Sequence, residues 1–117
     1  MNKLLAVLAV AALAAAASLA AAPGTIRGEV VDVTCQKTKG AGGVGTAHIG
    51  CIMMCARKGD QLGIMTQDAV YEIAGEYSAN NNAKLIEFLA AEVEATGEVT
   101  TTDGKKIMTV TSMKYAQ

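Results

Sequence analysis

Residues 92–114, EVEATGEVTTTDGKKIMTVTSMK, decide the fold that we expect. From Glu92 to Val99, small or apolar residues alternate with polar ones, which is the pattern of a strand with one buried and one solvated face. Asp103-Gly104 is a strong signal for a hairpin turn, so Lys105 to Lys114 is expected to be the returning strand. The residues expected to face inward on the first strand are Val93, Ala95, Gly97 and Val99.

Three further strands are expected upstream of this hairpin. Thr25 to Val33 is rich in β-branched residues, and Gly28 is a natural bend or bulge point within it. Leu62 to Thr66 and Ala69 to Ala74 are short apolar runs separated by Gln67-Asp68, which indicates a second hairpin. The chain is therefore predicted to contain five short strands.

Two helices are expected between these strands. After a Gly-rich loop over 36–45, Thr46 is a suitable N-cap for a helix that Gly59 ends. Asn80 to Asn82 offer caps for a second helix from Ala83 to Leu89. The expected core-facing residues are Ile49, Ile52, Met53 and Ala56 on the first helix and Leu85, Ile86 and Leu89 on the second.

The order of elements is strand, helix, two strands, helix, two strands. Five short strands with a helix between the third and the fourth are the layout of the OB-fold, a five-stranded, partly open Greek-key barrel. We therefore expect a mainly β domain with two short helices and an OB-fold-like barrel. A two-layer α+β sandwich is the alternative. The chain has no internal repeat, and residues 21–117 are expected to form a single domain.

The first twenty residues predict export. Lys3 supplies a positive start, Leu4 to Leu19 form an apolar run, and Ser18-Leu19-Ala20 is a small-x-small cleavage site, as in a secretory signal peptide. An N-terminal membrane anchor is the alternative, but the Ala-rich run barely reaches the length of about 20 residues that a spanning helix needs. We expect cleavage after Ala20, no stable membrane insertion afterwards, and a periplasmic or secreted protein.

Charge and composition argue against nucleic acid as a partner. Without Lys3, the ten Lys and Arg residues become nine, against eleven Asp and Glu, and they form no basic stripe. The chain has one Phe, three Tyr and no Trp, so it has very few aromatic side chains on which bases could stack.

All three cysteines and the only histidine lie within about twenty residues of one another, between Cys35 and Cys55. If residues 46–58 are helical, His48, Cys51 and Cys55 fall within roughly 60 degrees of one another on the helix surface. Cys35 lies just upstream, at the expected end of the first strand. Four N and S ligands then converge, which is the number that a closed tetrahedral metal site needs.

The spacing therefore predicts a metal site formed by Cys35, His48, Cys51 and Cys55. Zn²⁺ accepts a Cys₃His set, and soft ligands in an exported protein also permit Cu(I), with Met54 as an extra thioether. We expect zinc ahead of copper.

Two other interpretations of the cysteines stay open. Export favours disulfides, and a bond from Cys35 to Cys51 or Cys55 would tie the first strand to the helix and leave one thiol free. Alternatively, Cys51 and Cys55 act as a redox pair, with His48 lowering a thiol pKa.

The chain also resembles a group of small exported bacterial proteins of OB-like fold, mostly of uncharacterised function. They begin with a Gly-x-Val/Ile-x-Asp-x-x-Cys strand and continue with a Gly-rich loop, a His-x-x-Cys-x-x-x-Cys helix and a compact sheet. The matching residues are Gly28, Val30, Asp32 and Cys35, then His48, Cys51, Cys55 and Gly97. The resemblance implies the fold and export, but no activity.

No residues compose a catalytic set, so the sequence predicts a binding module and not an enzyme. Asp32, Asp60 and Asp68 are spread along the chain and are interpreted as acids of turns and rims. The expected partner is a metal ion. The alternative is a disulfide-stabilised interaction domain without metal that binds a peptide, an oligosaccharide or an envelope protein through the barrel surface.

Overall fold

The computed structural model describes residues 21–117. The expected signal peptide, residues 1–20, lies outside the described residues. In the part of the chain from residue 21 onward, no helix is long and apolar enough to cross a membrane.

Five strands close into a barrel in the order β1-β2-β3-β5-β4, with β4 returning to β1. Neighbouring strands are antiparallel except β3 and β5, which run parallel. This confirms the mainly β, OB-fold-like barrel. The strands are β1 (Ala22–Asp32), β2 (Leu62–Met65), β3 (Val70–Ala74), β4 (Glu92–Thr102) and β5 (Lys105–Tyr115).

β1 pairs with a different neighbouring strand along each part of its length. Ala22 to Glu29 pair with β4, and Glu29 to Asp32 pair with β2. Gly28 lies where the pairing changes, and a Cβ there would collide with the carbonyl oxygen of Met65. The expected bend point is therefore a position where the backbone of another strand leaves no room for a side chain.

The hairpin of residues 92–114 forms as expected, with a bulge in β4 between Thr96 and Gly97. Gly97 is buried, and a Cβ on it would collide with the carbonyl oxygen of Thr109. The inward alternation is confirmed because Val93 and Ala95 are fully buried while Glu92 and Glu98 are exposed.

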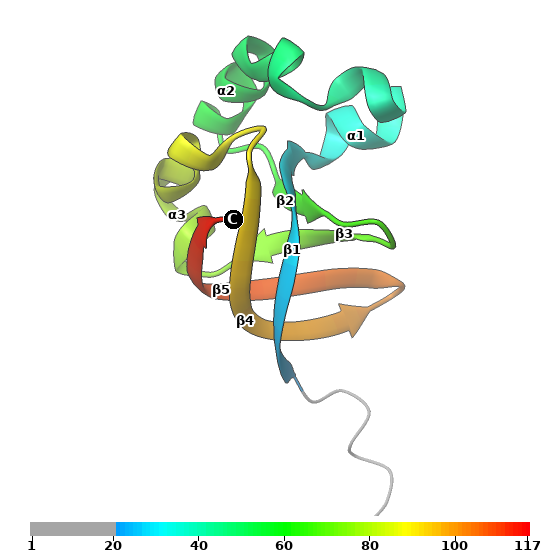
Figure 1. Ribbon diagram of the computed structural model, residues 1–117, viewed down its shortest axis with the longest axis vertical. Helices are drawn as coiled ribbons and strands as arrows, with labels where there is room; N and C mark the ends of the chain where they lie inside the picture. The colour runs from blue at the N-terminus through cyan, green and yellow to red at the C-terminus, as the bar shows by residue number, and fades with distance from the viewer. Residues whose placement is uncertain (1–20) are drawn as a thin grey trace, which may run out of the picture.

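Helical segments cover one end of the barrel (Figure 1). Ile52 and Ala56 of the second α-helix and Leu85 of the last 3₁₀ helix are fully buried and join the barrel core. The largest fully buried side chains of the barrel itself are Val30, Val31, Leu62, Ile64, Ile73, Val93 and Met108. The helical segments are α1 (Val33–Lys39), η2 (Gly40–Gly43), η3 (Thr46–His48), α2 (Ile49–Arg57), η4 (Glu76–Ser78), α3 (Ala79–Asn82) and η5 (Ala83–Phe88).

The segment after β1 differs from the expectation. Most of the loop expected over 36–45 is helical, since α1 starts at Val33 directly after the strand and η2 follows it. The Asp32 side chain caps α1 by accepting a hydrogen bond from the Cys35 N–H at 2.9 Å. Cys35 therefore lies in the first turn of a helix, and not at the end of the strand.

The expectation for the start of the next helix was wrong as well. Thr46 begins the short 3₁₀ turn η3, and α2 starts only at Ile49, with His48 at the N-cap position and no side-chain cap. Because the helix begins late, its first residue projects from the core, and Ile49 is 40% exposed. Ile52 and Ala56 are buried and Met53 is partly buried against the core, as expected.

The second expected helix is a 3₁₀ helix, η5, and the three asparagines before it do not cap it. Asn80, Asn81 and Asn82 all have positive φ, between 53° and 60°, which Asn tolerates better than most residues. The buried side chain of Asn82 instead reaches across to the end of α2.

Candidate metal centre

The three cysteines gather where α1 and α2 approach the end of β1. Cys35 lies on α1, and Cys51 and Cys55 lie one turn apart on α2. All three are free thiols in the structure. The disulfide therefore stays a prediction, as does the redox pair.

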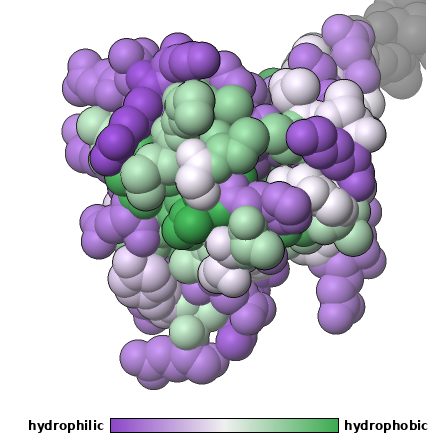
Figure 2. All heavy atoms as spheres, turned by 90° about the horizontal axis from the view of Figure 1, so that it is seen from above, coloured by the Kyte–Doolittle hydropathy of each residue, from purple (hydrophilic) through white to green (hydrophobic). Residues whose placement is uncertain are grey.

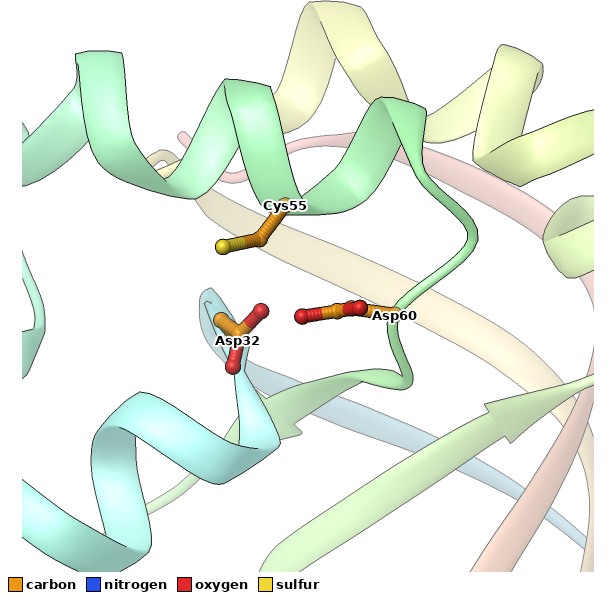
Figure 3. Close-up of side chains that lie close together, drawn as sticks. All are labelled: Asp32, Cys55 and Asp60. Atoms are coloured by element: carbon orange, nitrogen blue, oxygen red, sulfur yellow. The ribbon is translucent and has the colours of Figure 1, made fainter.

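One cysteine forms a cluster with two carboxylates. Ligand atoms of Asp32, Cys55 and Asp60 all lie within 4.8 Å of one another. Asp32 ends β1, Cys55 lies in the last turns of α2, and Asp60 lies in the turn that leads from α2 to β2. Figure 3 shows the three side chains pointing toward one another from these three segments. We call them the Asp-Cys-Asp cluster.

Asp32 is the unusual member of the cluster because it is completely buried. Its Oδ1 accepts the N–H of Cys35, whereas its Oδ2 has no hydrogen-bond partner among residues 21–117. A buried polar atom without a partner costs roughly 1–3 kcal/mol, and more if it is charged. A buried atom without a partner requires an explanation. A ligand is one explanation here, because the Asp32 side chain faces a thiol and a second carboxylate.

Asp60 is held in place through its backbone. Its N–H donates to the carbonyl of Cys55 at 3.2 Å, and its carbonyl accepts from the Asn82 side chain at 2.9 Å. Asn82 donates also to the carbonyl of Ala56 at 2.9 Å. Gly59, with φ +92°, makes the turn between helix and strand. The amide of Asn82 thus fastens the Asp60 turn to the end of the helix that carries Cys55.

Negative groups crowd the site. Burial raises the pKa of the Cys55 thiol, and the charges of Asp60 and Asp32 raise it further. Burial likewise raises the pKa of Cys35, with the neighbouring Asp32 as the next cause. Because the site disfavours added negative charge, a bound cation would be stabilised by the same groups.

The structure brings the four predicted ligands together only in part. Cys55 belongs to the cluster. Cys35 contacts Asp32 through its backbone, and Cys51 lies one helical turn before Cys55, but neither sulfur is among the ligand atoms within 4.8 Å of one another. His48 is exposed and outside this group. As a complete ligand set, the four residues stay a prediction.

The position of His48 follows from the local backbone. The shared stripe with Cys51 and Cys55 required one continuous helix from residue 46. His48 instead ends a 3₁₀ turn and has φ −110° and ψ 13°, outside the helical range. The helical wheel of α2 therefore does not extend to it.

Sequence reasoning assigned Asp32 and Asp60 to turns and rims and missed their proximity. A signal for Asp32 was present, since an Asp that ends a β-branched strand three residues before Cys35 is a suitable N-cap. The position after Gly59 marked Asp60 as a turn residue and nothing more. Comparison of the chain with protein-family models, curated proteins and solved structures gave no match. The assignment of the site therefore rests on its geometry.

Proposed function

We propose that the protein is a small exported metal-binding module that holds a zinc ion with Asp32, Cys55 and Asp60. The observation that carries this proposal is the completely buried Asp32, whose Oδ2 lacks a hydrogen-bond partner among the described residues and whose carboxylate supplies a ligand atom to the cluster. A cation coordinated there would give this oxygen its missing partner. It would also separate two carboxylates that otherwise repel each other.

The donor set favours zinc over copper. Two carboxylate oxygens and one thiolate are common ligands of Zn²⁺, whereas Cu(I) prefers sulfur ligands throughout. Met54, the thioether considered for copper, is 59% exposed and is not part of the cluster. Three protein ligands leave a position of a tetrahedral ion for water or a further donor.

Export remains part of the proposal and is supported by the N-terminal pattern of the sequence. The resemblance to small exported OB-like proteins agrees with this compartment. Binding of a peptide or an oligosaccharide on the barrel surface is the competing proposal, which needs no ion.

The substitution Asp32→Asn tests the site without removing the helix cap. Asn is as good an N-cap as Asp, so α1 and the bond from Cys35 are retained while the anionic ligand is lost. Loss of a residue that only hydrogen-bonds to a metal ligand costs about 10–100-fold in metal affinity, so we expect loss of this ligand itself to weaken zinc binding at least about 100-fold. Calorimetric titration and native mass spectrometry before and after acid treatment measure this.

The matched control is Asp68→Asn, the same change at an exposed acid of the β2–β3 turn. This variant should bind zinc as the wild type does. The proposal is wrong if the wild-type protein retains no zinc, or if Asp32→Asn binds it with unchanged affinity.

A further inference from the structure

The surroundings of Cys51 differ from those of the other two thiols. Cys51 is exposed, while Cys35 and Cys55 are partly buried. It lies four residues before Cys55 on α2, a spacing that places the two side chains on the same face, about 5–6 Å apart at their Cβ atoms. Cys51 is therefore the exposed neighbour of the cluster residue Cys55 on the same helix face.

The space beside Cys51 is open. A Cβ on the preceding residue, Gly50, would meet no atom within 4 Å, and the same holds for Gly45. Figure 2 shows this helical end of the molecule, where apolar side chains gather in the middle of the face and hydrophilic ones surround them. Cys51 is exposed on this part of the molecule, whereas Asp32 is buried and Cys55 and Asp60 are only partly exposed.

We propose that Cys51 is an exchange ligand, through which the ion bound by the Asp-Cys-Asp cluster passes to and from an external sulfur or nitrogen donor. This inference rests on the proposed zinc site and adds that the site is built to release its ion to an acceptor. The buried Asp32 holds the ion from the barrel side, and the exposed thiol meets the acceptor on the solvent side.

The exchange is a sequence of ligand substitutions without any change of oxidation state. The Cys51 thiol releases its proton to solvent as its sulfur bonds to zinc and displaces the water from the position that the three cluster residues do not fill. Donor atoms of the acceptor then replace Cys55 and the two carboxylates at the ion one after another, and the released Cys55 thiolate takes up a proton from water. Finally the bond to Cys51 breaks, and its thiolate takes up a proton from water.

The test measures the rate at which zinc leaves the loaded protein for the chromogenic chelator 4-(2-pyridylazo)resorcinol, followed by stopped-flow absorbance. In the wild type, the rate should increase with chelator concentration, because the acceptor takes part in the substitution. In Cys51→Ser the rate should fall about tenfold or more and lose most of its dependence on chelator concentration, a loss of the size seen for outer-shell partners. The equilibrium affinity for zinc should stay within about threefold of the wild type, as for a surface substitution, since Cys51 is not a resting ligand.

Met54→Ser is the matched control, because Met54 is an exposed sulfur residue on the same helix. Its transfer rate should stay within about twofold of the wild type, as expected for a surface substitution. Circular dichroism checks that each variant is folded.

Three results would overturn the inference. If Cys51→Ser transfers zinc at the wild-type rate, Cys51 is not on the path. If Cys35→Ser shows the slow, concentration-independent transfer instead, the path runs past α1. If the wild-type protein binds no zinc at all, the proposed function fails and the inference fails with it, a result distinct from the other two.

Discussion

The two oxygens of Asp32 have different roles. Oδ1 accepts the N–H of Cys35 and so starts α1, whereas Oδ2 is buried without a hydrogen-bond partner among residues 21–117, in a side chain that faces Cys55 and Asp60. One oxygen thus serves the fold, and the other is available for a ligand. An asparagine at this position can still cap α1 but cannot supply an anionic metal ligand. The substitution therefore tests metal binding without removing the helix cap.

We therefore expect Asp32→Asn to stabilise the metal-free protein while it weakens the zinc-loaded one. In the absence of metal, the change removes a buried charge and supplies an N–H₂ donor facing the Asp60 carboxylate, a gain of about 1–3 kcal/mol in the free energy of unfolding. With zinc present at 100 times its dissociation constant, the wild type gains about 2.7 kcal/mol that the variant loses. Urea unfolding with and without zinc measures both; equal midpoints for the two metal-free proteins would contradict the assignment of Oδ2.

Asn82 combines a strained backbone with two buried hydrogen bonds. Its φ is +60°, and its amide holds the carbonyls of Ala56 and Asp60. Asn82→Gly accepts the backbone conformation and loses only the hydrogen bonds, so we expect a cost of about 1–3 kcal/mol in the free energy of unfolding. Asn82→Ala should cost about 1 kcal/mol more, because Ala disfavours positive φ. Urea denaturation of both variants measures the difference, and equal stabilities would show that the backbone is not strained there.

At the scale of elements, β1 joins the pairing of β4 to the pairing of β2 within the barrel. It pairs with β4 along its first part and with β2 along its last part, and Gly28 lies at the change. Asp32 ends the same strand, so the register of β1 also determines where the cluster forms.

Two alanine substitutions on β1 test whether Gly28 is required because a neighbouring backbone leaves no room for a Cβ or because glycine is flexible. A Cβ at Gly28 would collide with the Met65 carbonyl, whereas a Cβ at Gly24 would lie at an ordinary 3.8 Å from the Val99 side chain. Overpacking of this kind typically costs about 1–3 kcal/mol, so we expect Gly28→Ala to lower the unfolding free energy by at least that amount. Gly24→Ala should change it by no more than about 0.5 kcal/mol. Thermal unfolding compares the two, and similar losses would mean that Gly28 is chosen for flexibility alone.

The local sequence signals for the helices at the end of the barrel are weaker than those for the strands. α1 has a side-chain cap in Asp32, but α2 has none, and η5 follows a strained Asn segment. Their positions depend on contacts such as the Glu29 carboxylate, which accepts the N–H of Gly45 at 2.8 Å and ties the connection between α1 and α2 to the barrel. Tertiary packing, and not local propensity, places the helices that carry the cysteines.

For the whole molecule, the crowded thiols and carboxylates make stability depend on pH. The folded protein raises the pKa of Cys35 and Cys55, through burial first and then through neighbouring charges, those of Asp32 and Asp60 among them. The folded state therefore keeps both thiol protons at pH values where the unfolded chain, with thiol pKa values of about 8.5, has lost them. The two thiols therefore contribute fully to the free energy of unfolding below the unfolded-state pKa of about 8.5. Their contribution is lost as the pH rises through their folded-state pKa values.

We accordingly expect the urea midpoint of the metal-free protein to fall between pH 8 and pH 10, the range above the ordinary thiol pKa of about 8.5. The double variant Cys35→Ser, Cys55→Ser should show a shallower fall, because serine does not titrate there. Other groups that titrate in this range contribute equally to both proteins. Parallel curves for the two would contradict the pKa shifts.

The strands and their hairpins could be predicted from the sequence because their signals are local. Alternation from Glu92 to Val99 marks the inward face of β4, Asp103-Gly104 marks the turn, and Gly28 marks a bend point in β1. The order of these elements sufficed for the barrel, since few topologies accommodate five short strands with these connections.

The metal cluster could be predicted only in part. Cys55 was predicted from its spacing on a helix, but the convergence of Asp32 and Asp60 joins residues that are 28 positions apart in the chain. His48 is a residue that the spacing placed wrongly. It ends a 3₁₀ turn of three residues, so it does not share a helix face with Cys51 and Cys55. What the sequence alone determined is therefore the set of strands, their inward faces and the region where the thiols gather. Only the tertiary structure decided which thiols and carboxylates lie close together. Closing the barrel brings the end of β1 against the turn before β2, and a local sequence pattern cannot predict that contact.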